Sequence, residues 1–206
     1  MMAPIRPTFR EERALLTEGF SVVAGVDEAG CGCLAGPVCA AAAVLPFDSR
    51  IALVRDSKTL SEAQRERAAE MVRERAAAWS VGWATAGEVD DLNIRKAAAL
   101  AMRRAVEGLE LRPQFVLVDA FEIPDLGLPQ RGIVRGDRHV KSIAAASVLA
   151  KTARDARLAE LDREYPGYGF AKHKGYGTAA HREALRRLGP CPEHRRTYAP
   201  VRALLK

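Results

Sequence analysis

Four acidic residues lie where the chain leaves a strand or approaches a helix, and carboxylates at such places can bind metal ions. Asp27 and Glu28 follow an apolar run, Asp119 follows a second one, and Asp137 precedes a long helical pattern. Carboxylates that converge repel one another unless a cation neutralises them, and oxygen-only ligands select hard ions such as Mg²⁺ or Mn²⁺. Two such ions can activate a water and stabilise the leaving oxygen in phosphodiester hydrolysis. The four acids therefore predict a site for phosphate chemistry.

Each acid also has a structural interpretation. Asp137 could cap its helix and Asp119 a turn, while Asp27 and Glu28 could lie in a solvated loop. For any single acid taken alone, such a structural role is the better explanation. Their occurrence together with a basic C-terminal part favours a common site.

The strand that carries the first pair decides whether the two carboxylates can meet. Successive side chains of a strand point to opposite faces of the sheet, so Asp27 and Glu28 share a site only if the strand ends at Asp27. Gly30 and Gly32 follow directly, and glycine lets the backbone turn sharply. We therefore expect the strand to end at Asp27.

The elements that position these acids follow from hydrophobic periodicity and turn residues. We expect an α/β fold: a five-stranded mixed sheet flanked by helices, with a basic helical segment at the C-terminus. Its organisation should be an N-terminal extension (1–19), a core (20–165) and a basic C-terminal segment packed on the core (166–206). The expected strands are 20–26, 38–45, 79–85, 113–119 and 132–134, and the expected helices are 61–78, 89–109, 138–164 and 178–188.

Composition and charge narrow the class of protein. The chain has 206 residues, of which 48% are hydrophobic and 28% charged, as in globular proteins. Residues 151–206 contain 13 Lys and Arg against 6 Asp and Glu, a net charge of +7, and residues 1–150 sum to −1. A basic block of this kind favours contact with nucleic acid phosphates, although it could serve solubility alone.

The location is expected to be the cytoplasm, because neither a secretory signal nor an apolar run of membrane-spanning length is recognisable. Cys31, Cys33, Cys39 and Cys191 fit no zinc-hook spacing and are expected to be free thiols. A metal or redox pair at Cys31 and Cys33 is the weaker alternative.

Several motifs in the same order resemble bacterial ribonuclease HII, from about residue 20 to the end of the chain. The string Val26-Asp-Glu-Ala-Gly-Cys-Gly-Cys-Leu-Ala-Gly-Pro-Val38 resembles the family pattern D-E-A-G-R-G-x-L-A-G-P-V. Further matches are Asp56-Ser-Lys-Thr-Leu60, Asp90-Asp-Leu-Asn-Ile94, Leu117-Val-Asp119, Gly136-Asp137, Ser142-Ile-Ala-Ala-Ala-Ser-Val-Leu-Ala-Lys151, His173-Lys-Gly-Tyr-Gly-Thr178 and Gly189-Pro-Cys-Pro-Glu-His-Arg-Arg-Thr-Tyr-Ala-Pro200.

The resemblance implies an RNase H-like fold, with residues 20–165 as its catalytic core, and an endonuclease that hydrolyses the RNA strand of RNA–DNA hybrids. It also implies nicking on the 5′ side of single ribonucleotides in duplex DNA, leaving a 3′-hydroxyl and a 5′-phosphate. Asp27, Glu28, Asp119 and Asp137 fall on the family's four metal-binding catalytic acids, with Mg²⁺ or Mn²⁺ as cofactor.

Substrate choice depends on the 2′-hydroxyl of the ribonucleotide. In the family a Gly-Arg-Gly turn contacts this hydroxyl and the adjoining phosphate, and a tyrosine packs on the neighbouring sugar. The resemblance places these roles on Gly30, Cys31, Gly32 and Tyr176.

Lys58 and Lys174 are the best candidates for phosphate contacts, followed by Arg195 and Arg196, although each taken alone fits a solvated surface charge. Ser142, Ser147 and Lys151 are expected to be packing or backbone-contact residues, and His173 a surface histidine more than a proton carrier.

The chain departs from the family pattern at Cys31, which replaces the arginine. A charge-assisted phosphate contact is thereby lost, and such a bond contributes about 1.5–3 kcal/mol. We expect hydrolysis to be retained, with weaker binding or weaker discrimination of the junction.

Two other functions stay open. The chain could be an RNase H-like nuclease that cuts DNA junctions, or a nucleic-acid-binding protein without catalysis, although the presence of all four acids argues against the latter. The expected partners are RNA–DNA hybrid and ribonucleotide-containing duplex DNA, with no membrane contact, and the protein is expected to be a monomer. The terminus Val201-Arg-Ala-Leu-Leu-Lys206 contains no convincing clamp-binding peptide.

Overall fold

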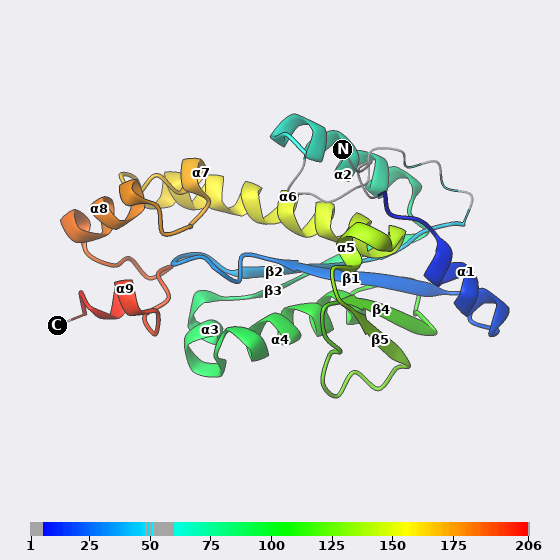
Figure 1. Ribbon diagram of the computed structural model, residues 1–206. Coiled ribbons are helices and arrows are strands. Elements are labelled where there is room, and N and C mark those ends of the chain that lie inside the picture. The colour runs from blue at the N-terminus through cyan, green and yellow to red at the C-terminus, as the bar shows by residue number, and fades with distance from the viewer. Residues whose placement is uncertain (1–5, 48, 50, 52–59, 206) are drawn as a thin grey trace, which may run out of the picture.

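A mixed sheet forms the centre of the computed structural model, which describes residues 6–47, 49, 51 and 60–205. Its strands are β1 (Val23–Ala29), β2 (Val38–Val44), β3 (Ala78–Ala84), β4 (Phe115–Asp119) and β5 (Gln130–Ile133). They lie in the order β3-β2-β1-β4-β5, with β1–β2 and β2–β3 antiparallel and β1–β4 and β4–β5 parallel (Figure 1). The expected five-stranded mixed sheet is confirmed.

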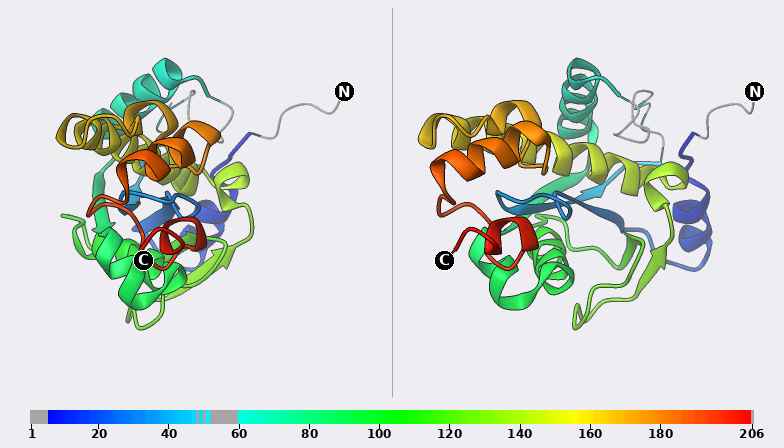
Figure 2. Two further views of the ribbon diagram at one scale, coloured as in Figure 1. Left: turned by 90° about the vertical axis from the view of Figure 1, so that its left-hand side faces the viewer. Right: turned by 60° about the vertical axis from the view of Figure 1, so that its left-hand side comes forward.

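Helices cover both faces of this sheet (Figure 2). One face packs against α2 (Glu62–Arg75) and α6 (Lys141–Glu164), and the other against α3 (Ala86–Leu92) and α4 (Ile94–Glu107). The remaining helices are α1 (Arg10–Thr17), α5 (Gly136–His139), α7 (Phe170–His173), α8 (Ala179–Leu188) and α9 (Ala199–Arg202). No helix of the described ranges is long and apolar enough to cross a membrane. The division into extension, core and basic segment stays a prediction.

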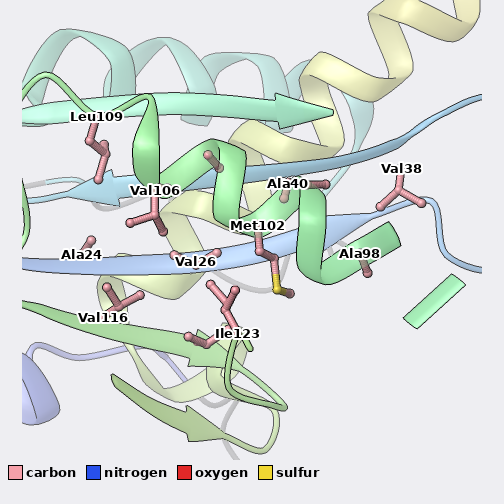
Figure 3. Close-up of a cluster of buried hydrophobic side chains, with 14 of the residues drawn as sticks. Ala24, Val26, Val38, Ala40, Ala98, Met102, Val106, Leu109, Val116 and Ile123 are labelled. Atoms are coloured by element: carbon pink, nitrogen blue, oxygen red, sulfur yellow. The ribbon is translucent and has the colours of Figure 1, made fainter. Parts of the chain in front are cut away.

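Small side chains let the two helical layers approach the sheet closely. Strand β2 contains four consecutive alanines, residues 40–43, and all of its residues are buried. A Cβ atom at Gly25 in β1 would collide with the α6 backbone at Ser142 and Ile143, and one at Gly82 in β3 would collide with the α4 backbone. Figure 3 shows side chains packed between the sheet and α4, among them Val26 of β1 and Met102 of α4. Because such interiors are close-packed, the helix positions are fixed by these contacts.

Three boundaries differ from the sequence-based expectations. Strand β1 does not end at Asp27 but continues to Ala29, because it keeps pairing with β2 as far as Cys39. The expected helix 89–109 is two helices, since Asn93 has a φ of 70° and its side chain accepts hydrogen bonds from the first N–H groups of α4. Asp137 lies inside the short helix α5, and the long helix begins only at Lys141.

The N-terminus of α6 is capped from a distant helix. Its own N-cap residue, Val140, makes no side-chain capping bond. Instead, the buried carboxylate of Glu12 in α1 accepts hydrogen bonds from the N–H and the hydroxyl of Ser142, both at 2.8 Å. Burial raises the pKa of Glu12, and the hydrogen bonds from Ser142 oppose the rise. Helix α1, which has no clear signal in the sequence, therefore supplies the cap of α6.

Replacing Glu12 with alanine should lower the free energy of unfolding by about 1–3 kcal/mol, because two buried donors of Ser142 lose their acceptor. Glu12→Gln keeps an acceptor oxygen and should recover most of the loss. Urea unfolding measures both values, and Glu18→Ala in an exposed position of the same region is the control. A Glu12→Ala protein as stable as the control variant would contradict the capping role.

Candidate active site

The first three acids meet at one edge of the sheet. Asp27 and Glu28 lie near the end of β1, and Asp119 is the last residue of the parallel neighbour β4. The register pairs Val26 with Val118, so Asp27 and Asp119 are the next residues of adjacent strands. Helix α5 brings the fourth acid nearby: a Cβ atom at Gly136 would lie 3.4 Å from Asp119 Oδ1, and Asp137 is the next residue. The topology thus brings the acid-bearing segments together.

Asp27 and Glu28 start on opposite faces of β1, since the strand continues past them. Asp27 faces α6, where Ser147 hydrogen-bonds its carboxylate, whereas Glu28 Oε1 lies 3.7 Å from Cys31 Sγ. The expectation that the strand ends at Asp27 was therefore wrong, and a metal site shared by the two carboxylates stays a prediction. Burial, and then repulsion from Glu28 and Asp119, raise the pKa of Asp27 well above its ordinary value. The three carboxylates interact although two of them leave the strand on opposite faces.

The residues present fit a divalent cation by their chemistry. All four acids offer oxygen ligands, which hard cations prefer. Asp119 Oδ1 is buried and has no hydrogen-bond partner among the described residues, and a buried polar atom in this condition costs free energy. The same residues contain no group of three or more His, Cys, Asp or Glu side chains placed so that they could hold an ion. The assignment of these acids as metal ligands stays a prediction.

Directly after β1, the glycine turn (residues 30–36) lies between two distant segments. Cys33 forms an isolated antiparallel bridge with Tyr176, and Ala35 forms one with His194. The Leu34 N–H donates to the Gly175 carbonyl at 2.8 Å, and the Arg195 N–H donates to the Leu34 carbonyl at 2.9 Å. The turn is therefore the middle segment of three, with residues 174–176 on one side and 193–195 on the other.

Two buried guanidinium groups hold this turn from within. Arg154 of α6 donates to the carbonyls of Pro37, Lys174 and Ala35 at 3.0, 2.9 and 3.2 Å. Both Arg154 and Arg195 are 0% exposed. Buried charges need such hydrogen bonds to offset their desolvation.

Arg195 holds the other end of the same turn. It donates twice to the Gly36 carbonyl, at 3.1 and 2.9 Å, and once to the Cys31 carbonyl at 3.0 Å. The interpretation of Arg195 as a phosphate contact or a solvated surface charge was wrong, because a side chain that packs against carbonyls inside the protein cannot reach solvent.

The remaining residues expected to bind substrate surround the turn. The Tyr176 ring is 45% exposed, and Lys151 Nζ lies 5.9 Å from its centroid. Lys174 Nζ lies 3.3 Å from Glu62 Oε1 in an ion pair. Gly30 has a φ of 98°, a left-handed conformation that favours glycine. Lys58 lies outside the described residues.

The Cys31 thiol is neutral at physiological pH. Burial and the nearby Glu28 carboxylate raise its pKa to about 12. Cys31 therefore supplies no charge, positive or negative, at the position of the family's arginine. All four cysteines are free thiols, as expected.

Sequence reasoning missed the role of α6 in this site. Ser147 hydrogen-bonds Asp27, Lys151 lies over Tyr176, and Arg154 holds the turn. Their spacing of four and then three residues places them on one face of the helix. This spacing is the sequence feature from which a common role could have been predicted. Ser142 is buried and hydrogen-bonded, as expected of a packing residue. His173 is half-buried with both ring nitrogens bonded, which overturns the expectation of a surface histidine.

Comparison with known proteins decides the family. The sequence profile described as Ribonuclease HII matches residues 24–201. The chain belongs to the ribonuclease HII family. A curated ribonuclease HII of Desulfitobacterium hafniense strain Y51 is 52% identical over 201 residues, covering 98% of this chain and 77% of that protein. The chain is therefore an endoribonuclease of the ribonuclease H type.

Solved structures of ribonuclease HII relatives have the same fold. The ribonuclease H2 of Pyrococcus horikoshii OT3 superposes with a TM-score of 0.74 at 25% identity, over 89% of this chain and 96% of that one. The RNase HII of Archaeoglobus fulgidus, in a complex with PCNA, gives 0.69 at 27% identity, over 81% and 87%. A Bst-RNase HIII in complex with Mn²⁺ gives 0.73 at 22% identity, over 89% and 69%. These likenesses confirm the RNase H-like fold.

Alanine substitutions at two glycines of the turn should affect stability differently, because one glycine is strained and packed while the other has free space around it. Gly30→Ala places a Cβ in a left-handed conformation and against the Arg154 guanidinium, so it should lower the free energy of unfolding by about 1–3 kcal/mol. Gly32→Ala meets no atom within 4 Å and should unfold like the parent. Thermal unfolding of the pair tests this. Equal melting temperatures would show that Arg154 does not hold the turn as described.

Proposed function

We propose that this chain hydrolyses the RNA strand of RNA–DNA hybrids and nicks duplex DNA on the 5′ side of single ribonucleotides. The products would be a 3′-hydroxyl and a 5′-phosphate. The main support is the continuity of the acids with the glycine turn: Glu28 in β1 is followed within two residues by Gly30. A ribose recognised by the turn would therefore have its phosphate beside the acids. Family membership supports the same function.

The proposed cofactor is Mg²⁺ or Mn²⁺, held by Asp27, Glu28, Asp119 and Asp137. A pair of bound cations would supply positive charge that favours ionisation of a water and stabilises the leaving oxygen. The repulsion between Asp27 and its acidic neighbours and the partnerless Asp119 Oδ1 support this choice. The Mn²⁺ complex of a Bst-RNase HIII is consistent with it.

The chain's own residues would bind and orient the substrate. The backbone of Gly30, Cys31 and Gly32 can approach the 2′-hydroxyl closely, because two of the three lack a side chain. The exposed ring of Tyr176 would pack on the neighbouring sugar. Lys174, and Lys58 outside the described residues, would contact phosphates, which position the duplex without specifying its sequence.

The biological setting that we propose is ribonucleotide excision repair and hybrid removal in the cytoplasm by a monomer. The +7 charge of residues 151–206 fits a duplex partner. The Archaeoglobus fulgidus structure contains PCNA, and no clamp partner is proposed for this chain, because residues 201–206 contain no convincing clamp-binding peptide.

Replacing Asp119 with asparagine should abolish cleavage of a duplex that contains one ribonucleotide, because a ligand of the proposed cations loses its charge. Folding should be unaffected or slightly favoured, since Asp119 repels Asp27. Mn²⁺ should raise the melting temperature of the parent and not of the variant, because ligand binding stabilises the folded state. Asp125→Asn changes an acid whose side chain is 91% exposed and is the matched control.

Two outcomes would count against the proposal. Undiminished cleavage by a folded Asp119→Asn protein would remove this residue from the reaction. An all-DNA junction cut by the parent as fast as the ribonucleotide duplex would instead favour a junction nuclease.

Restoring the family's arginine with Cys31→Arg should strengthen substrate binding. A charge-assisted contact to phosphate should lower KM about tenfold. This is near the smallest effect expected for such a bond, because the turn is partly exposed to solvent. Cys31→Ser, which adds no charge, is the control, and kcat should change less than KM. Steady-state kinetics on the single-ribonucleotide duplex and on a long hybrid measure both. Unchanged KM and unchanged junction preference would contradict the role assigned to this position.

A further inference from the structure

A hydrogen-bonded pair of buried histidines lies behind the glycine turn. His181 of α8 is 0% exposed and His194 is 1% exposed. Their Nε2 atoms are 3.1 Å apart, and His181 Nδ1 lies 2.9 Å from the Tyr176 carbonyl oxygen. At the other end, the Cys191 N–H donates to His194 Nδ1 at 3.0 Å. The four groups form a continuous chain from Tyr176 to Cys191.

The partners at the two ends fix the proton on each ring. A carbonyl oxygen only accepts, so His181 carries its proton on Nδ1 and offers Nε2 as an acceptor. A backbone N–H only donates, so His194 accepts at Nδ1 and donates from Nε2. The central bond then runs from His194 Nε2–H to His181 Nε2. Every bond is satisfied when both rings are neutral, and an added proton on either ring would set two donors face to face.

The surroundings of the pair also favour neutral rings. His173 of α7 stacks on His181 with centroids 4.2 Å apart, and the Tyr168 ring lies 5.0 Å from His194. The Cys191 thiol lies 3.1 Å from His194 Nδ1, while the neighbouring Glu193 interacts with Arg157. Arg154 of α6 reaches the Lys174 carbonyl nearby.

Burial lowers the pKa of both histidines. For His181 the hydrogen bond to the Tyr176 carbonyl opposes this shift. For His194 burial and the neighbouring His181 lower the pKa to about 4.

The pair joins the two segments that flank the turn. His181 holds the Tyr176 carbonyl, and Tyr176 is bridged to Cys33 of the turn. His194 is itself bridged to Ala35, two residues further along the turn. The imidazole–imidazole bond therefore closes a ring of contacts around the middle of the turn.

We propose that His181 and His194 are positioning residues for ribonucleotide recognition: their mutual hydrogen bond sets the placement of Tyr176 and the glycine turn relative to each other. This inference depends on the proposed function of that turn. Neither residue contacts the acids, so their loss should weaken discrimination of the ribonucleotide and leave the chemical step largely intact.

The inference also gives the direction of a pH effect. Above the ordinary histidine pKa of 6.5, both rings are neutral and their hydrogen bond contributes fully to stability. Below pH 6.5 this contribution decreases, and the bond is lost near pH 4, where His194 becomes protonated in the folded protein. Discrimination should therefore fall on the acid side. Because Glu28 also lies beside Cys31 of the turn, the effect of the histidines is the difference in acid dependence between the parent and His181→Asn.

The test compares the Kd of two duplexes, one all-DNA and one with a single ribonucleotide, by fluorescence anisotropy in EDTA. His181→Ala and His194→Ala should each reduce the ratio of the two Kd values about tenfold, the effect expected for one lost hydrogen bond, and should raise KM more than they lower kcat. His181→Asn keeps a donor near the Tyr176 carbonyl, so it should recover part of the ratio and remove its dependence on acid pH. Glu183→Gln, on the exposed face of α8, is the control.

Nitrogen NMR of the imidazole rings provides a readout that needs no substrate. The expected spectrum has the proton on Nδ1 of His181 and on Nε2 of His194, and the opposite tautomers would overturn the inference even if the alanine variants failed to fold. Folded variants with an unchanged Kd ratio, or with lower kcat at constant KM, would also overturn it. A parent protein that shows no preference for the ribonucleotide duplex would refute the proposed function instead.

Discussion

The close contact between α6 and β1 at Gly25 determines most of the geometry of the site. With no side chain at this position, the α6 backbone at Ser142 and Ile143 lies directly against the strand. From that contact the helix runs along the sheet, so that Ser147 reaches Asp27 and Arg154 reaches the glycine turn about two turns further on. A rigid helix of 24 residues thus fixes the distance between the acids and the turn. The cap from Glu12 holds the beginning of the same helix.

The buried Asp27 and the two buried arginines near the turn have different kinds of neighbours. Asp27 lies beside Glu28 and Asp119, and its burial, followed by repulsion from these two acids, raises its pKa. The two buried guanidinium groups close to the turn, Arg154 and Arg195, are instead satisfied by backbone carbonyls. The two arginines therefore stabilise the turn through its carbonyls, which offset the cost of burying their charges.

The sequence predicted the parts of the fold that depend on local patterns. Apolar and alternating patterns located all five strands, and the expected helices 61–78 and 178–188 correspond to α2 and α8. Features that depend on tertiary contacts were missed, because β1 is prolonged by pairing with β2 and Arg195 is buried by a turn about 160 residues earlier in the chain. Two of the basic residues counted toward a nucleic-acid surface are thus internal, which charge counting cannot detect.

The position of Cys31 illustrates why the turn can tolerate the loss of a family side chain. Its carbonyl, and not its thiol, is held by Arg195 and by the Tyr198 hydroxyl, the latter at 2.8 Å. A turn defined by carbonyl contacts keeps its course whichever side chain stands at residue 31, provided that Gly30 can adopt its left-handed conformation. The course of the backbone and the chemistry of the side chain at residue 31 are therefore separable. Buried carbonyl contacts set the former, while the neutral thiol of Cys31 sets the latter.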